Sequence, residues 1–234
     1  MRPSEESRTP RSRGESTAHR LLKQLALAWA RQRRLLLAAA EVRLPRAGYR
    51  ADVAAATPRA LTETARTAVF ECKAARADFL CDSAPEADAG ARIEALAARL
   101  AGLRELIAGH RPDLRRGEEL FAEFDAYDLR GLRHETHDRL AAELRIEQRK
   151  LREGTKFARM MRWRSASLLY LVTEPGVCRP HEVPEGWGLL VRAEETLELV
   201  VRPCLNPTTT EERVALVERI AATVTKPQSV GIYS

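Results

Sequence analysis

The hydrophobic residues near the start of the chain recur first with the period of a helix and then with that of a strand. From Ser16 to Ala40, leucines and Trp29 fall about three to four residues apart, which predicts one long helix with an N-cap at Ser16-Thr17. Beyond Ala40, short apolar runs of strand character are separated by turn residues, and this pattern predicts strands. The predicted strands are residues 41–44, 49–55 and 67–73, the first two joined as a hairpin through residues 45–48.

The middle of the chain, residues 83–154, lacks strand-like runs and is rich in Ala, Leu, Arg and Glu. Two stretches within it carry leucine and isoleucine at helical spacing, one ending near Gly109 and the other running from Leu132 to Leu151. A shorter helical turn is expected between them, at residues 120–127. We therefore predict a helical hairpin inserted into the domain.

The strand pattern returns after Thr155. The predicted elements are a helix over residues 156–164, strands over 167–173, 188–191 and 197–202, and a closing helix over 210–224. The predicted fold class is α/β, with a central mixed sheet flanked by helices and a large helical hairpin insertion. Residues 17–82 and 155–226 form the core, 83–154 the insertion, and 1–16 a polar tail that buries too little apolar area to offset the entropy of ordering.

The net charge of the chain is compatible with a polyanionic binding partner but does not identify one. The chain has 234 residues, a net charge of +6 and a pI of about 9.4, and only five of its basic residues are lysines. This excess suits a polyanion such as DNA, and it suits a basic soluble protein almost equally well. Without a long uncharged apolar run or a C-x-x-C spacing, we expect a cytoplasmic protein with no membrane segment, zinc site or disulfide framework.

Candidate chemistry lies in two acidic residues placed inside strand-like runs. Asp52 falls in the second predicted strand and Glu71 in the third, where an unpaired buried carboxylate would cost several kcal/mol, so a cation is the expected partner. Since strand side chains alternate, Glu71 and Lys73 share one face at roughly 6–7 Å. An acid and a base on one surface, with a second acid on the neighbouring strand, favour a metal-assisted hydrolytic site.

The spacing of these residues resembles the signature of the PD-(D/E)XK nuclease superfamily. Asp52 is followed, after 18 residues, by Glu71-x-Lys73, and Glu41 lies eleven residues upstream of Asp52, at the expected helix-to-strand junction. A narrower resemblance is to the MmcB-like proteins of bacteria, which are assigned to DNA repair. The matching segments are Glu41-Val42, Arg50-Ala51-Asp52-Val53, Glu71-x-Lys73, Asp78-Phe79-x-x-Asp82, Lys156-Phe157, Leu168–Val172 and Pro184–Val191. Two segments depart from the pattern: Ala74-Ala75 replace small hydroxyl residues, and Arg50-Ala51 stands where the superfamily name implies proline.

The resemblance implies a restriction-endonuclease-like core and a role for each motif residue. Asp52, Glu71 and the backbone carbonyl of Cys72 would ligate Mg²⁺ or Mn²⁺, cations that prefer oxygen ligands, and Glu41 would complete the shell directly or through water. Lys73 would orient or deprotonate the attacking water. Residues assigned to contact with nucleic acid are Arg50, Lys156 and Arg159, although a charged helix face is the commoner reason for the last two.

The predicted function is a Mg²⁺-dependent deoxyribonuclease, with endonuclease the preferred form, acting in DNA repair or in defence against foreign DNA. The alternative is a catalytically weak or inactive nucleic-acid-binding or assembly subunit that keeps the fold. Taken singly, Glu71 with Lys73 also fits a solvated pair on a strand, and Asp52 fits a cap on backbone amides. For the helical insertion, a homo-oligomer contact, a protein partner and a clamp over substrate all remain open.

Overall fold

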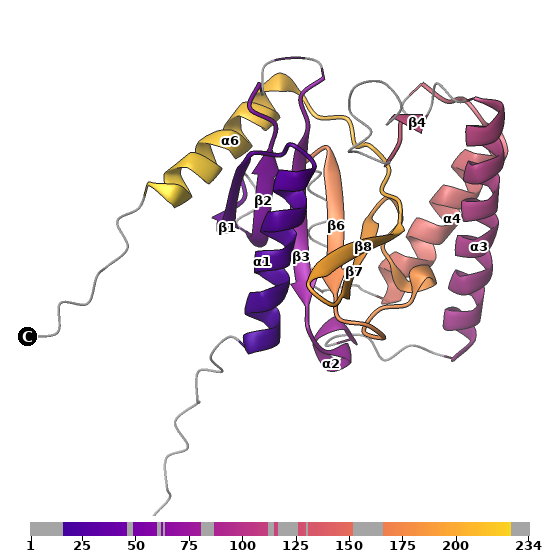
Figure 1. Ribbon diagram of the computed structural model, residues 1–234. Coiled ribbons are helices and arrows are strands. Elements are labelled where there is room, and N and C mark those ends of the chain that lie inside the picture. The colour runs from indigo at the N-terminus through magenta and orange to yellow at the C-terminus, as the bar shows by residue number, and fades with distance from the viewer. Residues whose placement is uncertain are drawn as a thin grey trace, which may run out of the picture.

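The protein forms a six-stranded mixed sheet with helices on both faces (Figure 1). The computed structural model describes residues 16–45, 49–59, 62, 64–80, 87–111, 115–116, 126–129, 131–151 and 166–225. Within these residues the strand order is β1-β2-β3-β6-β7-β8. The α/β class, with its central mixed sheet flanked by helices, is thus confirmed. The expected helix over residues 156–164, with Lys156 and Arg159, and all but Ser16 of the expected tail lie outside the described residues.

The first helix is shorter than its leucine spacing predicts. Helix α1 covers Thr17–Gln32, and the Ser16 hydroxyl caps it by accepting from the backbone N–H of His19. The prediction that it runs to Ala40 was wrong, because Arg34 turns the chain with a φ of 57° and residues 37–40 enter β1, Leu37–Arg43. Alanine favours helix, but pairing with buried residues of β2 outweighs that preference.

The first three strands form an antiparallel meander and the next two run parallel to the third. Strands β1, β2 (Arg50–Ala56) and β3 (Thr67–Lys73) pair in succession. Strand β6 (Leu168–Thr173) lies parallel to β3, and β7 (Gly188–Ala193) lies parallel to β6. Strand β8 (Thr196–Val201) closes the sheet as a hairpin with β7. The carboxyl ends of β3, β6 and β7 therefore meet at one edge of the sheet.

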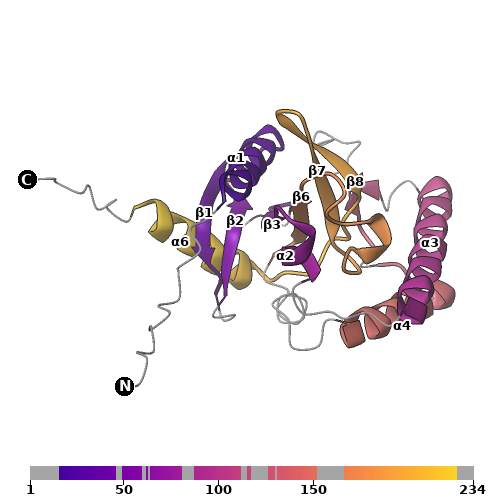
Figure 2. The same cartoon turned by 90° about the horizontal axis from the view of Figure 1, so that it is seen from below.

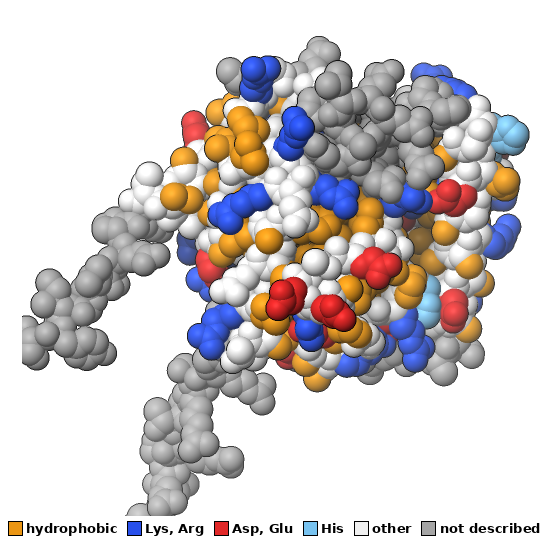
Figure 3. Space-filling view, viewed as in Figure 1, with side chains coloured by type: hydrophobic (Ala, Val, Ile, Leu, Met, Phe, Trp, Pro, Cys, Tyr) orange, Lys and Arg blue, Asp and Glu red, His pale blue; other side chains and the backbone are white. Residues whose placement is uncertain are grey.

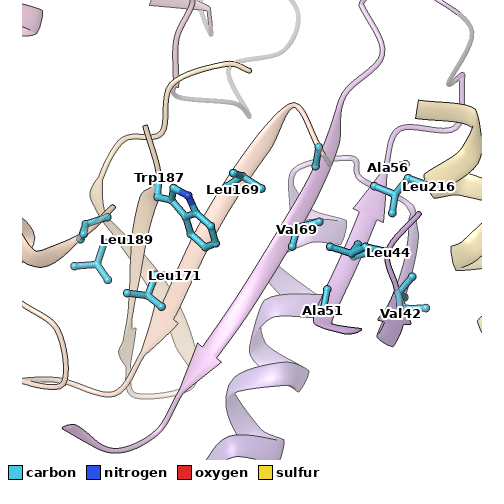
Figure 4. Close-up of a cluster of buried hydrophobic side chains, with 14 of the residues drawn as sticks. Val42, Leu44, Ala51, Ala56, Val69, Leu169, Leu171, Trp187, Leu189 and Leu216 are labelled. Carbon is cyan, nitrogen blue, oxygen red and sulfur yellow. The ribbon is translucent and has the colours of Figure 1, made fainter. Parts of the chain in front are cut away.

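Each face of the sheet packs against a different helix, as Figure 2 shows for α1 and α6. Trp29 of α1 meets Phe70 and Tyr170 edge-on, with ring centroids 5.9 and 5.1 Å apart. On the other face, Leu216 of α6 (Thr210–Val224) belongs to the same cluster as Val69 and Leu171 (Figure 4). Burial of both sheet faces explains the nearly continuous apolar runs of the central strands.

Two long helices, α3 (Ala87–His110) and α4 (Glu135–Leu151), pack on each other beyond β7 and β8 (Figures 1 and 2). Their shared cluster contains Ile93, Leu100, Leu140, Ala141 and Leu144. Shorter elements are α2 (Arg76–Leu80), the 3-10 helix η2 (Pro180–Glu182), and the strand pair β4 (Arg115–Arg116) and β5 (Ala126–Tyr127). The helical turn expected at 120–127 was wrong for the last two residues, which are in β5 because Tyr127 also bonds the backbone of Pro203 and Leu205; residues 120–125 lie outside the described part.

Polar contacts fix the α3–α4 pair to the loop that precedes β7. The Gln148 side-chain amide donates to the Val183 carbonyl and accepts from the Glu185 backbone N–H, both at 2.7 Å. Arg104 of α3 contacts the Glu185 carboxylate at 2.7 Å. Because Gln148 is only 1% exposed, water cannot replace these bonds, and the pair is held as part of the domain.

We predict that Gln148→Ala destabilises the protein by about 2–3 kcal/mol, because it leaves two buried backbone groups without their partner. Urea unfolding measures this loss. The matched control is Arg149→Ala, an exposed position on the same helix, which should change stability by about 0.5 kcal/mol or less. Equal unfolding midpoints for the two variants would contradict the role given to Gln148.

Candidate functional site

The candidate site lies where the pairing of β2 with β3 ends. The last paired residues are Val53 and Phe70. Beyond this last pair, the Cys72 backbone N–H donates to Oδ2 of the Asp52 carboxylate at 2.8 Å. The Asp52 side chain thus binds the main chain between the two other motif residues, Glu71 and Lys73.

Glu71 is buried and bound from two sides. Its side chain is 1% exposed, and the Lys73 ammonium lies 3.3 Å from its Oε1, as the strand alternation predicts for residues on one face. The Tyr49 hydroxyl donates to the other oxygen, Oε2. Both oxygens of this buried carboxylate therefore face hydrogen-bond donors, while the Lys73 side chain remains 16% exposed.

The electrostatics of the site keep two neighbouring groups protonated. Burial, followed by the charge of Glu71 and the hydrogen bond to it, raises the pKa of the Tyr49 phenol far above its ordinary value. Burial, followed by the charges of Asp52 and Glu71, raises the pKa of the Cys72 thiol well above its usual range. Tyr49 is consequently a hydrogen-bond donor, and the Cys72 thiol is unsuited to act as a nucleophile.

Helix α1 adds two basic side chains that are not part of the sequence motif. His19 and Lys23 stand four residues apart, on one face of the helix. His19 Nε2 lies 3.4 Å from Asp52 Oδ2, and the Lys23 ammonium contacts Glu41 Oε1. A lysine beside buried Leu22, Leu25 and Ala26 is the sequence signal that marks this position, since a charge inside an apolar stripe needs a partner. Tyr49 carries no comparable signal.

Glu41 lies inside β1, so the prediction of a helix-to-strand junction was wrong: the helix ends at Gln32, nine residues earlier. Its backbone has a φ of 59°, and its carboxylate contacts Lys23 and, at 2.7 Å, Arg50 Nε. Across the described part of the chain, no three His, Cys, Asp or Glu side chains form a group able to hold a metal ion. Arg50, expected to contact nucleic acid, has a side chain that is 67% exposed and is paired with Glu41.

The donor set of the site still fits a hard divalent cation. Mg²⁺ usually keeps several waters and is bound by one or two carboxylates, so Asp52 and Glu71 can suffice. The Cys72 carbonyl is a further oxygen donor: in a strand, the N–H and C=O of one residue point to the same side, and the Cys72 N–H points to Asp52. Asp52, Glu71 and the Cys72 carbonyl thus remain candidate ligands for Mg²⁺ or Mn²⁺, whereas Glu41 is paired with Lys23 and Arg50.

The helix that follows Lys73 is held in place by an ion pair. Arg76 of α2 contacts the Glu182 carboxylate of η2 and donates to the Val177 carbonyl at 2.9 Å. Partial burial raises the pKa of Glu182, but the hydrogen bonds from Arg76 and from the Arg179 backbone outweigh it and leave the pKa lowered. This pair fixes the direction in which the chain leaves the site.

Comparisons with known proteins add little to this description. No protein-family model matches the chain, and no curated protein matches it. A solved protein of unknown function from Silicibacter pomeroyi aligns with a TM-score of 0.46 and 14% identity, over 94% of this chain and 99% of that one. Within the described residues, no helix has the length and apolar content needed to cross a membrane.

We predict that Glu182→Gln destabilises the protein at pH 7 and that the difference from wild type shrinks in acid. A carboxyl whose folded-state pKa is lowered stabilises the fold above its ordinary pKa, 4.5 here, and loses that contribution as the pH falls through the folded value. Thermal melts from pH 7 to pH 3 test this, with Glu195→Gln in the β7–β8 turn as the control. A difference that stays constant over that range would rule out the proposed linkage.

We also predict that Tyr49→Phe lowers the free energy of unfolding by about 1–3 kcal/mol, because the buried Glu71 loses a donor to a charged acceptor. In a Glu71→Gln background the same change should cost less, since the acceptor is then neutral. Tyr127→Phe is the matched control, because the Tyr127 hydroxyl bonds a carboxylate, Glu105, that is 57% exposed. Equal losses for the two tyrosines would contradict a special role for Tyr49.

Proposed function

We propose that this protein is a metal-dependent nuclease that hydrolyses phosphodiester bonds of DNA with Mg²⁺ or Mn²⁺. The observation that carries the proposal is the position of Lys73, 3.3 Å from Glu71 on one strand, with Asp52 bound to the amide between them. This arrangement brings two carboxylates and an amine together from two adjacent strands, β2 and β3. It agrees with the Asp52, Glu71-x-Lys73 signature of the PD-(D/E)XK nucleases.

Each site residue has a distinct role in the proposed reaction. The metal ion would neutralise charge on the phosphate and lower the pKa of bound water. Asp52, Glu71 and the Cys72 carbonyl would hold it on the oxygen ligands that Mg²⁺ prefers. Lys73 would orient the attacking water or accept its proton, and the Tyr49 hydroxyl would keep the Glu71 carboxylate in a single orientation.

Positive charge around the carboxylates supports a phosphate substrate. Glu41 contacts the basic side chains of Lys23 and Arg50, and Glu71 contacts Lys73. His19 lies next to Asp52. On the face seen in Figure 3, basic side chains are interspersed with apolar and acidic ones and form no continuous stripe. The proposal therefore depends on the chemistry of the site more than on an extended basic surface.

A second candidate is a binding or assembly subunit that retains the fold with little or no catalysis. Its support is the pairing of Glu41 with Lys23 and Arg50, which satisfies by protein cations one of the acids that the resemblance assigns to the metal. Such a protein would bind DNA without cutting it. The two candidates differ in turnover, which is measurable directly.

We predict that purified protein cleaves DNA when Mg²⁺ or Mn²⁺ is supplied, and that Lys73→Ala and Glu71→Gln each reduce the rate by about 100-fold or more. Linear duplex, circular duplex and single-stranded DNA should be tested side by side. The control is Glu198→Gln, at an exposed position of β8, which should cleave like wild type.

Circular dichroism must show that each variant is folded. Wild-type rates in both folded site variants would refute the proposed active site. DNA binding by the wild-type protein without cleavage under either metal would favour the second candidate.

A further inference from the structure

Thr173, the last residue of β6, buries a hydroxyl group that has no hydrogen-bond partner within the described part of the chain. Its side chain is 0% exposed. The four residues before it in β6 are Leu, Tyr, Leu and Val, and a valine would fill the position of Thr173 without burying a polar atom. A buried hydroxyl without a partner among the described residues calls for an explanation, and a role in the function of the neighbouring site is one.

Thr173 lies next to Lys73 on the same face of the sheet. The two residues are register partners across the parallel pairing of β3 with β6. Val69 and Leu171 belong to one core cluster, as Figure 4 shows, and alternation places Lys73 and Thr173 on that same side. Neighbouring strands stand about 4.8 Å apart, so a lysine side chain easily reaches the adjoining threonine.

The other strand beside Thr173 offers it no polar partner at this position. There, its register partner in β7 is Val191. Among the register neighbours of Thr173, Lys73 is therefore the group able to hydrogen-bond its hydroxyl.

A metal ion at Glu71 would change what the Lys73 ammonium can bind. In the structure that ammonium lies 3.3 Å from Glu71 Oε1, while Oε2 accepts from Tyr49. A divalent cation on Glu71 would compete for Oε1 and repel the ammonium, since like charges in a buried site interact strongly. The Thr173 hydroxyl, on the same face of the sheet, is then an acceptor within reach of the ammonium.

We propose that Thr173 is a positioning residue whose hydroxyl accepts a hydrogen bond from the Lys73 ammonium when a metal ion occupies Glu71. This inference rests on the proposed metal-dependent function, and it explains why β6 ends in a buried threonine. In this position the hydroxyl holds the Lys73 amine beside the water that attacks the phosphate.

The first test follows the Lys73 side chain by NMR in protein carrying ¹⁵N- and ¹³C-labelled lysine, without DNA. The chain has five lysines, so comparison with Lys73→Ala identifies the resonance of Lys73. Addition of Mg²⁺ should shift this resonance and slow exchange of its ammonium protons in the wild type and in Thr173→Ser. In Thr173→Val the slowed exchange should be lost.

The second test measures cleavage by the same variants. Thr173→Val should lower kcat by about 10-fold to 100-fold with KM little changed, because it misplaces a reacting group without altering DNA binding. Thr173→Ser should restore most of the rate. Thr196→Val, at an exposed position of β8, is the matched control and should behave like wild type in both tests.

The outcomes separate this inference from the proposed function. A Mg²⁺ response of Lys73 that depends on Thr173, in a protein that does not cleave DNA, would support the inference and refute the nuclease. Cleavage by the wild type with an identical Lys73 response in Thr173→Val would overturn the inference alone. So would folded Thr173→Ser that recovers neither the Lys73 response nor most of the rate. Absence of any Mg²⁺ response at Lys73 in the wild type would overturn it as well.

Discussion

The hydrogen bond from the Cys72 backbone N–H to the Asp52 carboxylate is the contact on which the site depends. It replaces a strand-to-strand backbone bond with a side-chain bond just beyond the last β2–β3 pair. That exchange keeps the two strands together while it directs a carboxylate toward the residues that flank Cys72. Asp52 of β2 is thereby fixed next to Glu71 and Lys73 of β3, because it binds the amide between them. A charged acceptor also makes this bond stronger than the neutral bond it replaces.

The acidic side chains around this contact are balanced by groups from three different elements. Helix α1 supplies His19 to Asp52 and Lys23 to Glu41. Strand β3 supplies Lys73 to Glu71, and the start of β2 with the residue before it supplies Arg50 to Glu41 and Tyr49 to Glu71. Removing one partner from such a set leaves the other charge uncompensated, which is why each of these side chains affects the others. A metal ion bound at Glu71, as proposed, would have to compete with the Lys73 ammonium. In the proposed metal-bound state, Thr173 would offer the Lys73 ammonium a second acceptor.

Elements with strong local signals were predictable from the sequence, and contacts between distant residues were not. The closing helix, Thr210–Val224, was predicted correctly because its apolar spacing is regular and Thr209 with Glu212 forms a capping box. The Glu71–Lys73 contact followed from strand alternation alone. Residues 37–40 were mispredicted because their state is decided by pairing with β2, which local propensity does not record. His19, Lys23 and Tyr49 reach the site across long stretches of chain, and no spacing rule links such residues in advance.

The parallel pairing of β3 with β6 also bears on how the chain folds. Lys73 and Thr173 are register partners, so 99 residues separate the two sides of this pairing along the chain. As the ribosome releases the chain, β3 therefore stands with an open edge, next to the acidic residues of the site, until β6 has emerged. Helices α3 and α4 come from the intervening segment, and their packing on each other shortens the effective loop that β3–β6 pairing must close. The helix pair that flanks the finished sheet can thus serve first as the scaffold that brings its two halves together.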